Sequence, residues 1–599
     1  MQLVERAEVK LGDTWDLTAI YPSIDAWKAD FTALEGMAAQ VAIFPGTLHQ
    51  SAERLNDAVR LYLSMSRGLE KLYVYAHLKS DEDTANSTNL AYYEQSTNLY
   101  ARLGSLWSFL TPELLSIPDA RLAEFLNNPL LADIKRMIVD ILRYKPHTLS
   151  KEEENLLAMG SEVFGNADRI FSQLNNADLN FGSVTVDGQE RALTHGSYIV
   201  LLKHQDRAVR QQTFERFYSV YDAHKSTIAA ALSGATKRDV YLSRARKFSS
   251  ARTRALFGDN VSTDVYDNLI STVSDNLTPL HRYYELRKKL LGLTETRLFD
   301  THVPLVPDMT VEHSYEAAAN LVVDSLHPLG AEYTELLRTG LLEGKWVDRY
   351  ENRGKRSGAY SSGSYDTPPY ILMNYKHDNL HDVFTLAHEA GHSMHSLYSC
   401  RHQSYQDHGY TIFVAEVAST FNEQLLMKRL REIHKDNPAM MAYLVNQQID
   451  DIKGTLYRQT MFAEFERRTH ELAEANQPLT IDVFRSEYKT LLAKYFGPAV
   501  VLSPLEELEC LRIPHFYSAF YVYKYATGIS AAISLSEQVT HGGDAARERY
   551  LSFLKGGCSK YPLELLRDAG VDMASPEPVK AALLLFDRLV SELERLLSK

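Results

Sequence analysis

His388-Glu389-Ala390-Gly391-His392 is a stretch in which two histidines stand four residues apart. Residues at that spacing share one face of an α-helix, so a helix here would aim both imidazoles at a single point. Neutral imidazoles arranged in this way are common ligands of Zn2+. Glu389 would lie about 100° around the helix from His388, beside the metal position, where a general base for a metal-activated water is needed.

The residues around this stretch favour a buried helix. Asp378 or Asn379 can cap its start. Gly391 costs about 1 kcal/mol of helix propensity relative to Ala, so its place between the histidines predicts that another segment packs closely there; a merely tolerated glycine is the alternative. The apolar residues that would bury the helix are Val383, Phe384, Leu386, Ala387, Ala390, Met394 and Leu397.

The third ligand decides the class of site. The metzincin pattern requires Gly and His three and six residues after the second histidine, and those positions hold His395 and Tyr398. Glu416 instead lies in an apolar helical run, where a carboxylate without a cation or partner is costly to bury. We therefore predict Glu416 as the third ligand rather than a plain ion-pairing residue. Glu423, seven residues on, returns to nearly the same face and is predicted as an acceptor behind the metal ligands.

These residues resemble a known family. The run HEAGHSMHSLYS (388–399), with Glu416 inside FVAEVASTFNE (413–423), is similar to the zinc site of the thimet oligopeptidase superfamily, and most closely to its bacterial oligoendopeptidase F branch. The same resemblance is carried by WDLTAIYPS (15–23), GKRSGAYSSGSYDTPPYILMNY (354–375) and IPHFYSAFYVYKYATG (513–528). It therefore extends over nearly the whole chain.

The resemblance implies both a fold and an activity. The fold would be mainly α, a two-lobed helical ellipsoid with a zincin-like catalytic domain, a small β-sheet next to the active-site helix, and a deep substrate channel that excludes folded proteins. One Zn2+ per chain would be held by His388, His392 and Glu416. The enzyme would hydrolyse internal bonds of short unstructured oligopeptides, with Glu389 as the general base.

The segment 354–375 interrupts the helical pattern. Its Gly, Ser and Tyr residues disfavour a helix, and 370–375 is typical of a strand that leads into the metal helix. An extended peptide could pair with such an edge through main-chain hydrogen bonds, without demanding particular side chains. A surface loop is the alternative. The predicted substrate-binding residues are Gly358, Ala359, Tyr360 and Ser361.

His515 and the tyrosines that follow it offer donors for an oxyanion. Hydrolysis of an amide generates such a charge, and each preorganised donor can contribute roughly 3 kcal/mol to its stabilisation. Tyr521 and Tyr525 are four residues apart and could act together on a helix, whereas Tyr517 and Tyr523 are predicted to lie in the core or at a rim. The resemblance implies catalytic roles for His515, Tyr521 and Tyr525.

Composition predicts a cytoplasmic protein, while short peptides are the partners that the resemblance implies. The net charge of -13 over 599 residues, without a concentrated Lys/Arg segment, argues against nucleic acid. The start MQLVERAEVKLGD lacks an apolar signal core, and we find no apolar run of about 18 residues that could cross a membrane. Cys400, Cys510 and Cys558 are too few and too scattered for a disulfide framework.

Helical periodicity dominates the rest of the chain. We expect helices at 55–79, 87–110, 151–164 and 207–223, the last two capped by Ser150 and Asp206. A hairpin is expected from 179–186 and 190–193 around Asp187-Gly188. We place a domain boundary there, between an N-terminal helical domain (1–195) and a catalytic domain (196–599).

Two other classes of protein remain open. A gluzincin-type aminopeptidase would usually have its acidic ligand about 19 residues after the second histidine, where this chain has Thr411. A peptide-binding scaffold with a structural zinc would favour four closed protein ligands. Three ligands and an adjacent Glu leave a position open, which favours catalysis. Mn2+ or Co2+ could occupy the same donors, and the sequence does not set the oligomeric state.

Overall fold

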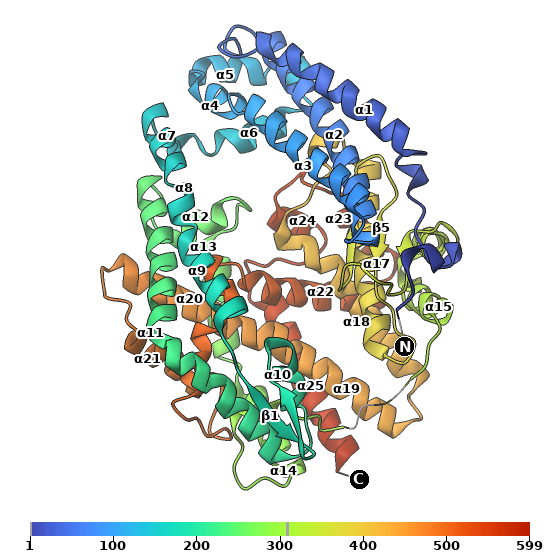
Figure 1. Cartoon of the computed structure of the whole chain (residues 1–599), viewed down its shortest axis with the longest axis vertical. Helices are drawn as coiled ribbons and strands as arrows, with labels where there is room; N and C mark the ends of the chain where they lie inside the picture. Colours follow the sequence, from blue (N-terminus) through green and yellow to red (C-terminus); the bar gives the residue numbers. More distant parts are fainter. Residues whose placement is uncertain (1–2, 307–308, 310, 599) are drawn as a thin grey trace. The chain divides into compact units, whose positions relative to one another are not determined.

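α-Helices dominate the computed structural model, which describes residues 3–306, 309 and 311–598 (Figure 1). The mainly α fold expected from the sequence is confirmed. Strands within these residues form one two-stranded and one three-stranded sheet. None of the helices in the described part of the chain combines the length and the apolar character needed to cross a bilayer.

The chain divides into two compact units, each assembled from three segments. The first comprises Met1–Pro146, Thr310–Arg429 and Leu535–Gly570. The second comprises His147–Met309, Leu430–Ser534 and Val571–Lys599. The division at residue 195 into an N-terminal and a catalytic domain stays a prediction.

The first unit holds the predicted metal helix. Its amino-terminal part packs α2 against α1 and α3, and α2 and α3 are the helices expected at 55–79 and 87–110. The core around Trp27 extends to Tyr370 and Leu372 of the three-stranded sheet. The helices of this unit are α1 (Ile24–Met37), α2 (Ala52–Glu82), α3 (Ser87–Leu106), α4 (Leu110–Ser116), α5 (Asp119–Leu126), α6 (Lys135–Leu142), α15 (Tyr315–Ser325), α16 (Ala331–Arg338), α17 (Leu380–His402), α23 (Gly543–Leu554), α24 (Pro562–Asp568) and most of α18 (Ile412–Ile433).

The three-stranded sheet lies against the metal helix, as expected. Its order is β3 (Val347–Asp348), β5 (Tyr370–Leu372) and β4 (Tyr360–Ser362), with β5 parallel to β3 and antiparallel to β4. Both β4 and β5 contact α17. The regular strand β5 is shorter than the predicted 370–375, although the N–H groups of Met373 and Tyr375 still donate to the carbonyls of Asp348 and Arg349. β4 stands at an edge of this sheet.

The second unit contains the remaining helices. The longest, α11, continues beyond the predicted 207–223 because its buried face continues through Ile228, Leu232 and Ala235. The helix predicted at 151–164 is divided at Gly160, a residue of low helix propensity. The helices are α7 (Lys151–Met159), α8 (Ser161–Phe164), α9 (Asn166–Gln173), α10 (His195–Leu202), α11 (Arg207–Ala245), α12 (Ala251–Phe257), α13 (Thr263–Ser274), α14 (Thr278–Leu290), α19 (Pro438–Ile452), α20 (Arg458–Glu474), α21 (Ile481–Phe496), α25 (Glu577–Leu597) and the first part of α22 (Tyr523–His541).

Local capping and turn signals were accurate in this unit. The Ser150 hydroxyl accepts a hydrogen bond from the N–H of Glu153, and the Asp206 carboxylate accepts one from the N–H of Ala208. The predicted hairpin is β1 (Ser183–Val186) paired with β2 (Gln189–Ala192). Asp187-Gly188 forms its turn with φ angles of 52° and 77°, as a tight two-residue turn requires.

Candidate metal centre and catalytic residues

Helix α17 presents His388 and His392 from a firmly buried scaffold. Asn379 is its cap, since the side-chain oxygen accepts a hydrogen bond of 3.1 Å from the N–H of His381. All seven apolar residues predicted to bury this helix are buried. The side chains of His388 and His392 retain 27% and 19% of their exposure, so the helix is fixed while its imidazoles stay accessible.

Gly391 allows a second helix to come very close. A Cβ built at this position would lie 2.5 Å from the Cα of Ser419 and 2.6 Å from the carbonyl oxygen of Ala418, both in α18. The predicted close approach is therefore confirmed. The side-chain amide of Asn422 adds a cross-link by donating to the carbonyl of Ala387 at 3.1 Å. α18 is thus held against the turn of α17 that carries the histidines.

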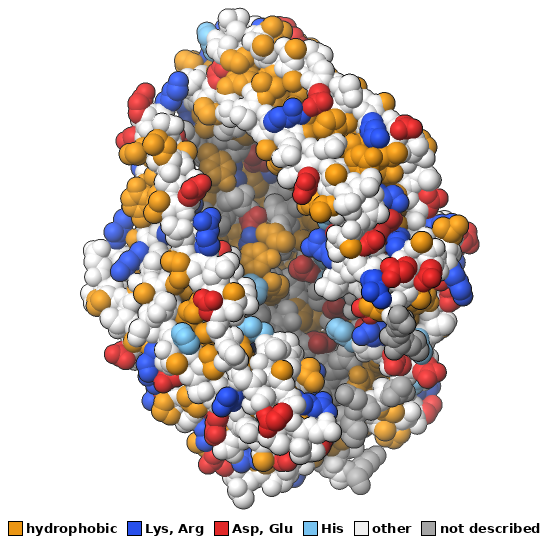
Figure 2. Space-filling view, viewed as in Figure 1, with side chains coloured by type: hydrophobic (Ala, Val, Ile, Leu, Met, Phe, Trp, Pro, Cys, Tyr) orange, Lys and Arg blue, Asp and Glu red, His pale blue; other side chains and the backbone are white. Residues whose placement is uncertain are grey.

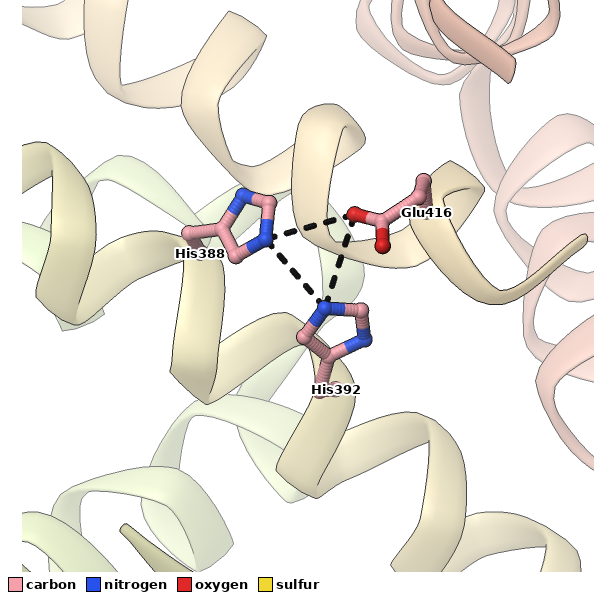
Figure 3. A group of neighbouring side chains, drawn as sticks. All are labelled: His388, His392 and Glu416. Atoms are coloured by element: carbon pink, nitrogen blue, oxygen red, sulfur yellow. Dashed lines mark hydrogen bonds and ion pairs between the residues drawn. The ribbon is translucent and has the colours of Figure 1, made fainter. Parts of the chain in front are cut away.

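His388, His392 and Glu416 converge on one point (Figure 3). The two Nε2 atoms are 3.2 Å apart, and the Glu416 Oε2 atom lies 3.3 Å from that of His388 and 3.6 Å from that of His392. Tetrahedral zinc with ligands at about 2.05 Å separates neighbouring donors by about 3.3 Å. The donor triangle therefore has the chemistry and the size that zinc needs.

Glu423 fixes the orientation of His388. Its Oε1 atom lies 2.8 Å from the Nδ1 atom of that imidazole, so Nδ1–H donates and Nε2 faces the triangle. Burial alone would lower the pKa of His388, but the carboxylates of Glu416 and Glu423 outweigh it and raise the pKa to about 10. The hydrogen bonds from both histidines also hold the pKa of Glu416 well below its usual range. Positive charge is strongly favoured at this point.

Glu389 lies buried beside the triangle on α17. Burial raises the pKa of its carboxyl group, while His388 and His392 oppose that shift. The backbone N–H of Ser361, in the edge strand β4, hydrogen-bonds to the same carboxylate. A raised carboxyl pKa and a fixed orientation are the properties that a general base needs.

The predicted substrate-binding segment is held by several side chains. Tyr360 donates its hydroxyl to Asp81 at 2.8 Å, and the side-chain amide of Asn374 donates to the carbonyl of Gly358 at 2.9 Å. The hydroxyl of Ser361 lies 2.8 Å from that of Ser393 on α17. These contacts fix β4 beside the metal helix. Sequence reasoning missed Asp81, which lies 279 residues before its partner.

His515, Tyr521 and Tyr525 form a cluster in the second unit. Ring centroids are 5.5 to 6.1 Å apart, and the Tyr525 hydroxyl lies 3.4 Å from the His515 Nε2 atom. Burial lowers the pKa of His515, so its imidazole is neutral at neutral pH. One expectation was wrong: Tyr521 precedes α22, which starts at Tyr523, so the two tyrosines do not share a helix. A turn of positive φ at Phe520 (54°) separates that helix from η14 (Pro514–Tyr517), which carries His515.

A buried carboxyl group supports the segment that carries this cluster. Glu466 on α20 accepts a hydrogen bond of 2.9 Å from the N–H of Phe520, and Arg238 donates to the carbonyl of Tyr517 at 3.1 Å. Burial raises the pKa of Glu466 well above the ordinary value. Sequence reasoning missed this residue. Its signal was present, because Glu466 lies in the apolar run MFAEFE (461–466), like Glu416 in its own run.

The remaining predicted residues lie outside these clusters. Tyr517 and Tyr523 are buried, as expected. His395 is also buried, stacks on Tyr410 with ring centroids 3.8 Å apart, and has its pKa lowered by burial to about 3. It is a core residue, although it follows the second metal-facing histidine by only three positions.

Comparisons with known proteins match this chain along most of its length. The model of peptidase family M3 matches residues 200–585, and the model described as oligopeptidase F matches residues 113–181. The oligopeptidase PepF of Bacillus subtilis (strain 168) is 45% identical over 100% of this chain and 89% of that protein. The oligoendopeptidase F homolog of Borreliella burgdorferi is 38% identical over 99% of this chain and 100% of that protein.

Solved structures show the same similarity. The crystal structure of oligoendopeptidase-F from Enterococcus faecium is 34% identical and has a TM-score of 0.74, over 95% of this chain and 98% of that one. A solved chain from Chlamydophila abortus is 36% identical with a TM-score of 0.93, over 99% of this chain and 100% of that one. The similarity in sequence and in fold thus extends along nearly the whole molecule.

Proposed function

Since the chain belongs to peptidase family M3 and is an oligoendopeptidase of the F group, we propose that it works with one zinc ion held by His388, His392 and Glu416. The observation that carries this proposal is the donor triangle, with edges of 3.2, 3.3 and 3.6 Å. Two imidazoles and one carboxylate are typical of catalytic zinc sites, which keep a further position open. Bound there, zinc would polarise the scissile carbonyl and lower the pKa of a water ligand.

Glu389 is the proposed general base. Its buried carboxylate would take a proton from the water as that oxygen bonds to the carbonyl carbon, and would return the proton to the nitrogen as the C–N bond breaks. The raised pKa of Glu389 brings the group closer to the working pH, where proton transfer in both directions is efficient. The N–H of Ser361 would keep the carboxylate oriented between these two steps.

The neighbouring residues have proposed supporting roles. Glu423 would hold the His388 imidazole in the tautomer that presents Nε2. His515, Tyr521 and Tyr525 are the proposed donors to the oxyanion, supported by their mutual contacts and by the resemblance described above. The segment 358–361, which includes the edge strand β4, is the proposed partner for the substrate main chain.

Short peptides are the proposed substrates and partners. Pairing through the main chain would accept many side chains, and size selection would follow from the channel that the resemblance implies. Acidic and basic side chains are interspersed on the face drawn in Figure 2, which does not favour a nucleic-acid partner there. Cys400, Cys510 and Cys558 are all unpaired, which supports the cytoplasm as the proposed compartment.

The decisive experiment separates metal binding from proton transfer. In the purified Glu389→Gln variant we expect turnover of a short peptide to fall by roughly 10²- to 10⁴-fold while bound zinc stays near one per chain. His388→Ala should lose both zinc and activity. Full activity of the Glu389 variant would end the general-base proposal, and zinc retained in the His388 variant would end the ligand assignment. Cleavage of amino-terminally blocked peptides would exclude the aminopeptidase alternative.

A further inference from the structure

The second unit contains a cavity that the proposed chemistry does not use. Its volume is about 420 Å3, and it lies among α14, α20, α21 and the segments next to them. No predicted metal ligand and no member of the His515 cluster lines it. Much of its wall is aromatic or aliphatic, formed by Leu280, Tyr284, Tyr457, Phe462, Phe496 and Ile513.

The charged residues of this cavity are not balanced. Lys203, Lys453, Arg458 and Arg512 face it, against only two acidic residues, Asp450 and Glu509. Asp450 pairs with Lys453 at 2.6 Å. Glu509 is the only acidic partner of both guanidinium groups among the described residues, accepting a hydrogen bond of 2.9 Å from Arg512 and pairing with Arg458. The hydroxyl of Tyr218 accepts one further hydrogen bond from Arg512, and that of Tyr488 accepts one from Arg458. An excess of positive charge is left.

Lys203 is the lining cation that has no acidic partner among the described residues. It follows α10 directly, and its ammonium group makes no hydrogen bond or ion pair with any residue that the structure describes. The guanidinium groups of Arg458 and Arg512 also carry five N–H donors each, of which Glu509 can use only some. His302, another lining residue, has its pKa lowered by loss of hydration inside the cavity and by the nearby cations, so its imidazole is neutral and does not offset the imbalance.

We propose that this cavity is a binding site for a small organic carboxylate with an apolar body, such as a hydrophobic amino acid or a dipeptide. Its volume falls in the range of about 300–1000 Å3 that small-molecule sites occupy. The aromatic wall would contact the apolar body, and Lys203 with the two guanidinium groups would bind the carboxylate through charge-assisted hydrogen bonds. Peptide hydrolysis releases molecules of this class, so the site would bind a product through residues other than those that form it.

Binding can be measured without turnover, which separates this proposal from the proposed function. The probes are N-acetyl-phenylalanine and its uncharged amide, titrated calorimetrically into the zinc-loaded enzyme and into enzyme treated with a chelator. We expect the acid to bind both preparations alike and the amide to bind at least tenfold more weakly, because a charged group would lose its partner. Binding that disappears with the metal would place the probe at the zinc site and overturn the proposal.

Two variants test whether the probe binds in the cavity. Lys203→Gln should weaken binding of the acid about tenfold and leave binding of the amide unchanged. Lys289→Gln is the matched control, since Lys289 is exposed on α14 and does not line the cavity. Gly454→Leu should abolish binding of both probes, because a Cβ at this lining position meets no atom within 4 Å and the side chain would extend into open space.

Thermal unfolding and circular dichroism would verify that the Gly454 variant folds. Lys203 is exposed, so its substitution keeps the proposal testable even if the glycine variant does not fold. Equal affinity for acid and amide, unchanged binding in the Lys203 variant, or no binding of the acid to the wild-type enzyme would each overturn the proposal.

Discussion

Gly391 of α17 lies directly against Ser419 of α18, so closely that a Cβ on the glycine would be 2.5 Å from the Cα of the serine. The two atoms nearest to such a Cβ belong to the backbone of α18. A backbone cannot change rotamer to avoid the clash, as a flexible side chain could. The position of Glu416, one helical turn before Ser419, therefore depends on the absence of one methyl group.

Gly391→Ala should weaken zinc binding by at least tenfold, because α18 must move away and take Glu416 with it. The measurement is a competitive titration of zinc against a chromophoric chelator. Gly104→Ala is the control, since a Cβ there, in the last turn of α3, meets no atom within 4 Å and the substitution should add helix propensity. Unchanged zinc affinity in the Gly391 variant would show that the helices can separate without loss of the site.

Substitution of Glu423 tests the orientation of His388. Loss of an acceptor behind a metal ligand typically costs about 10- to 100-fold in affinity, so Glu423→Ala should fall in that range. Glu423→Gln retains a neutral acceptor and should lose less zinc affinity than Glu423→Ala. The same zinc titration gives both values. Equal losses in the two variants would mean that the negative charge, rather than the hydrogen bond, is what His388 needs.

Zinc binding should strengthen as the pH rises. The pKa of His388 is raised to about 10 in the metal-free protein, so this imidazole carries a proton throughout the neutral range, and the metal must displace it. Affinity should therefore increase about tenfold per pH unit below that pKa, with about one proton released per zinc. Calorimetry in buffers of different ionisation enthalpy measures the proton. Zinc binding without proton release at pH 7 would contradict the expectation.

Glu466 should make stability depend on pH. Its folded-state pKa is raised well above the ordinary 4.5, so the folded protein holds a proton that the unfolded chain loses, and wild-type stability falls as the pH rises above that value. Glu466→Gln removes this dependence and still offers an oxygen to the Phe520 N–H. The difference in free energy of unfolding, variant minus wild type, should increase by up to about 1.4 kcal/mol per pH unit between pH 5 and the folded-state pKa.

Thermal unfolding of both proteins at several pH values would test this. A difference that does not change with pH would show that Glu466 is ionised in the folded state. Glu466→Ala, which removes the acceptor altogether, should be less stable than the Gln variant at every pH.

Local signals in the sequence were enough to identify the three side chains that converge at the candidate metal centre. The four-residue spacing of His388 and His392 and the cost of burying Glu416 are properties of short windows, and the cap at Asn379 is also local. The glycine between the histidines also indicated that another segment packs closely there, and that segment is α18.

Contacts between distant segments could not be predicted in the same way. The hydrogen bond from Tyr360 to Asp81 and that from Phe520 to Glu466 join residues far apart in the sequence. Neither contact produces a pattern in the hydrophobic periodicity from which it could be predicted. The start of α22 after Tyr521 depends on the backbone turn at Phe520, a residue type that seldom adopts positive φ. The length of β5 was overestimated because apolar composition does not show where regular pairing ends.

The core shared by Trp27, Tyr370 and Leu372 has a consequence for attempts to shorten this protein. A truncated version that starts at residue 196 would keep every proposed ligand and the base, yet it would expose the middle strand of the sheet beside them and remove Asp81, the partner of Tyr360. Such a fragment should be insoluble or inactive even though it retains all the residues proposed to bind the metal and transfer the proton. The amino-terminal helices are therefore part of the catalytic framework and not a detachable appendage.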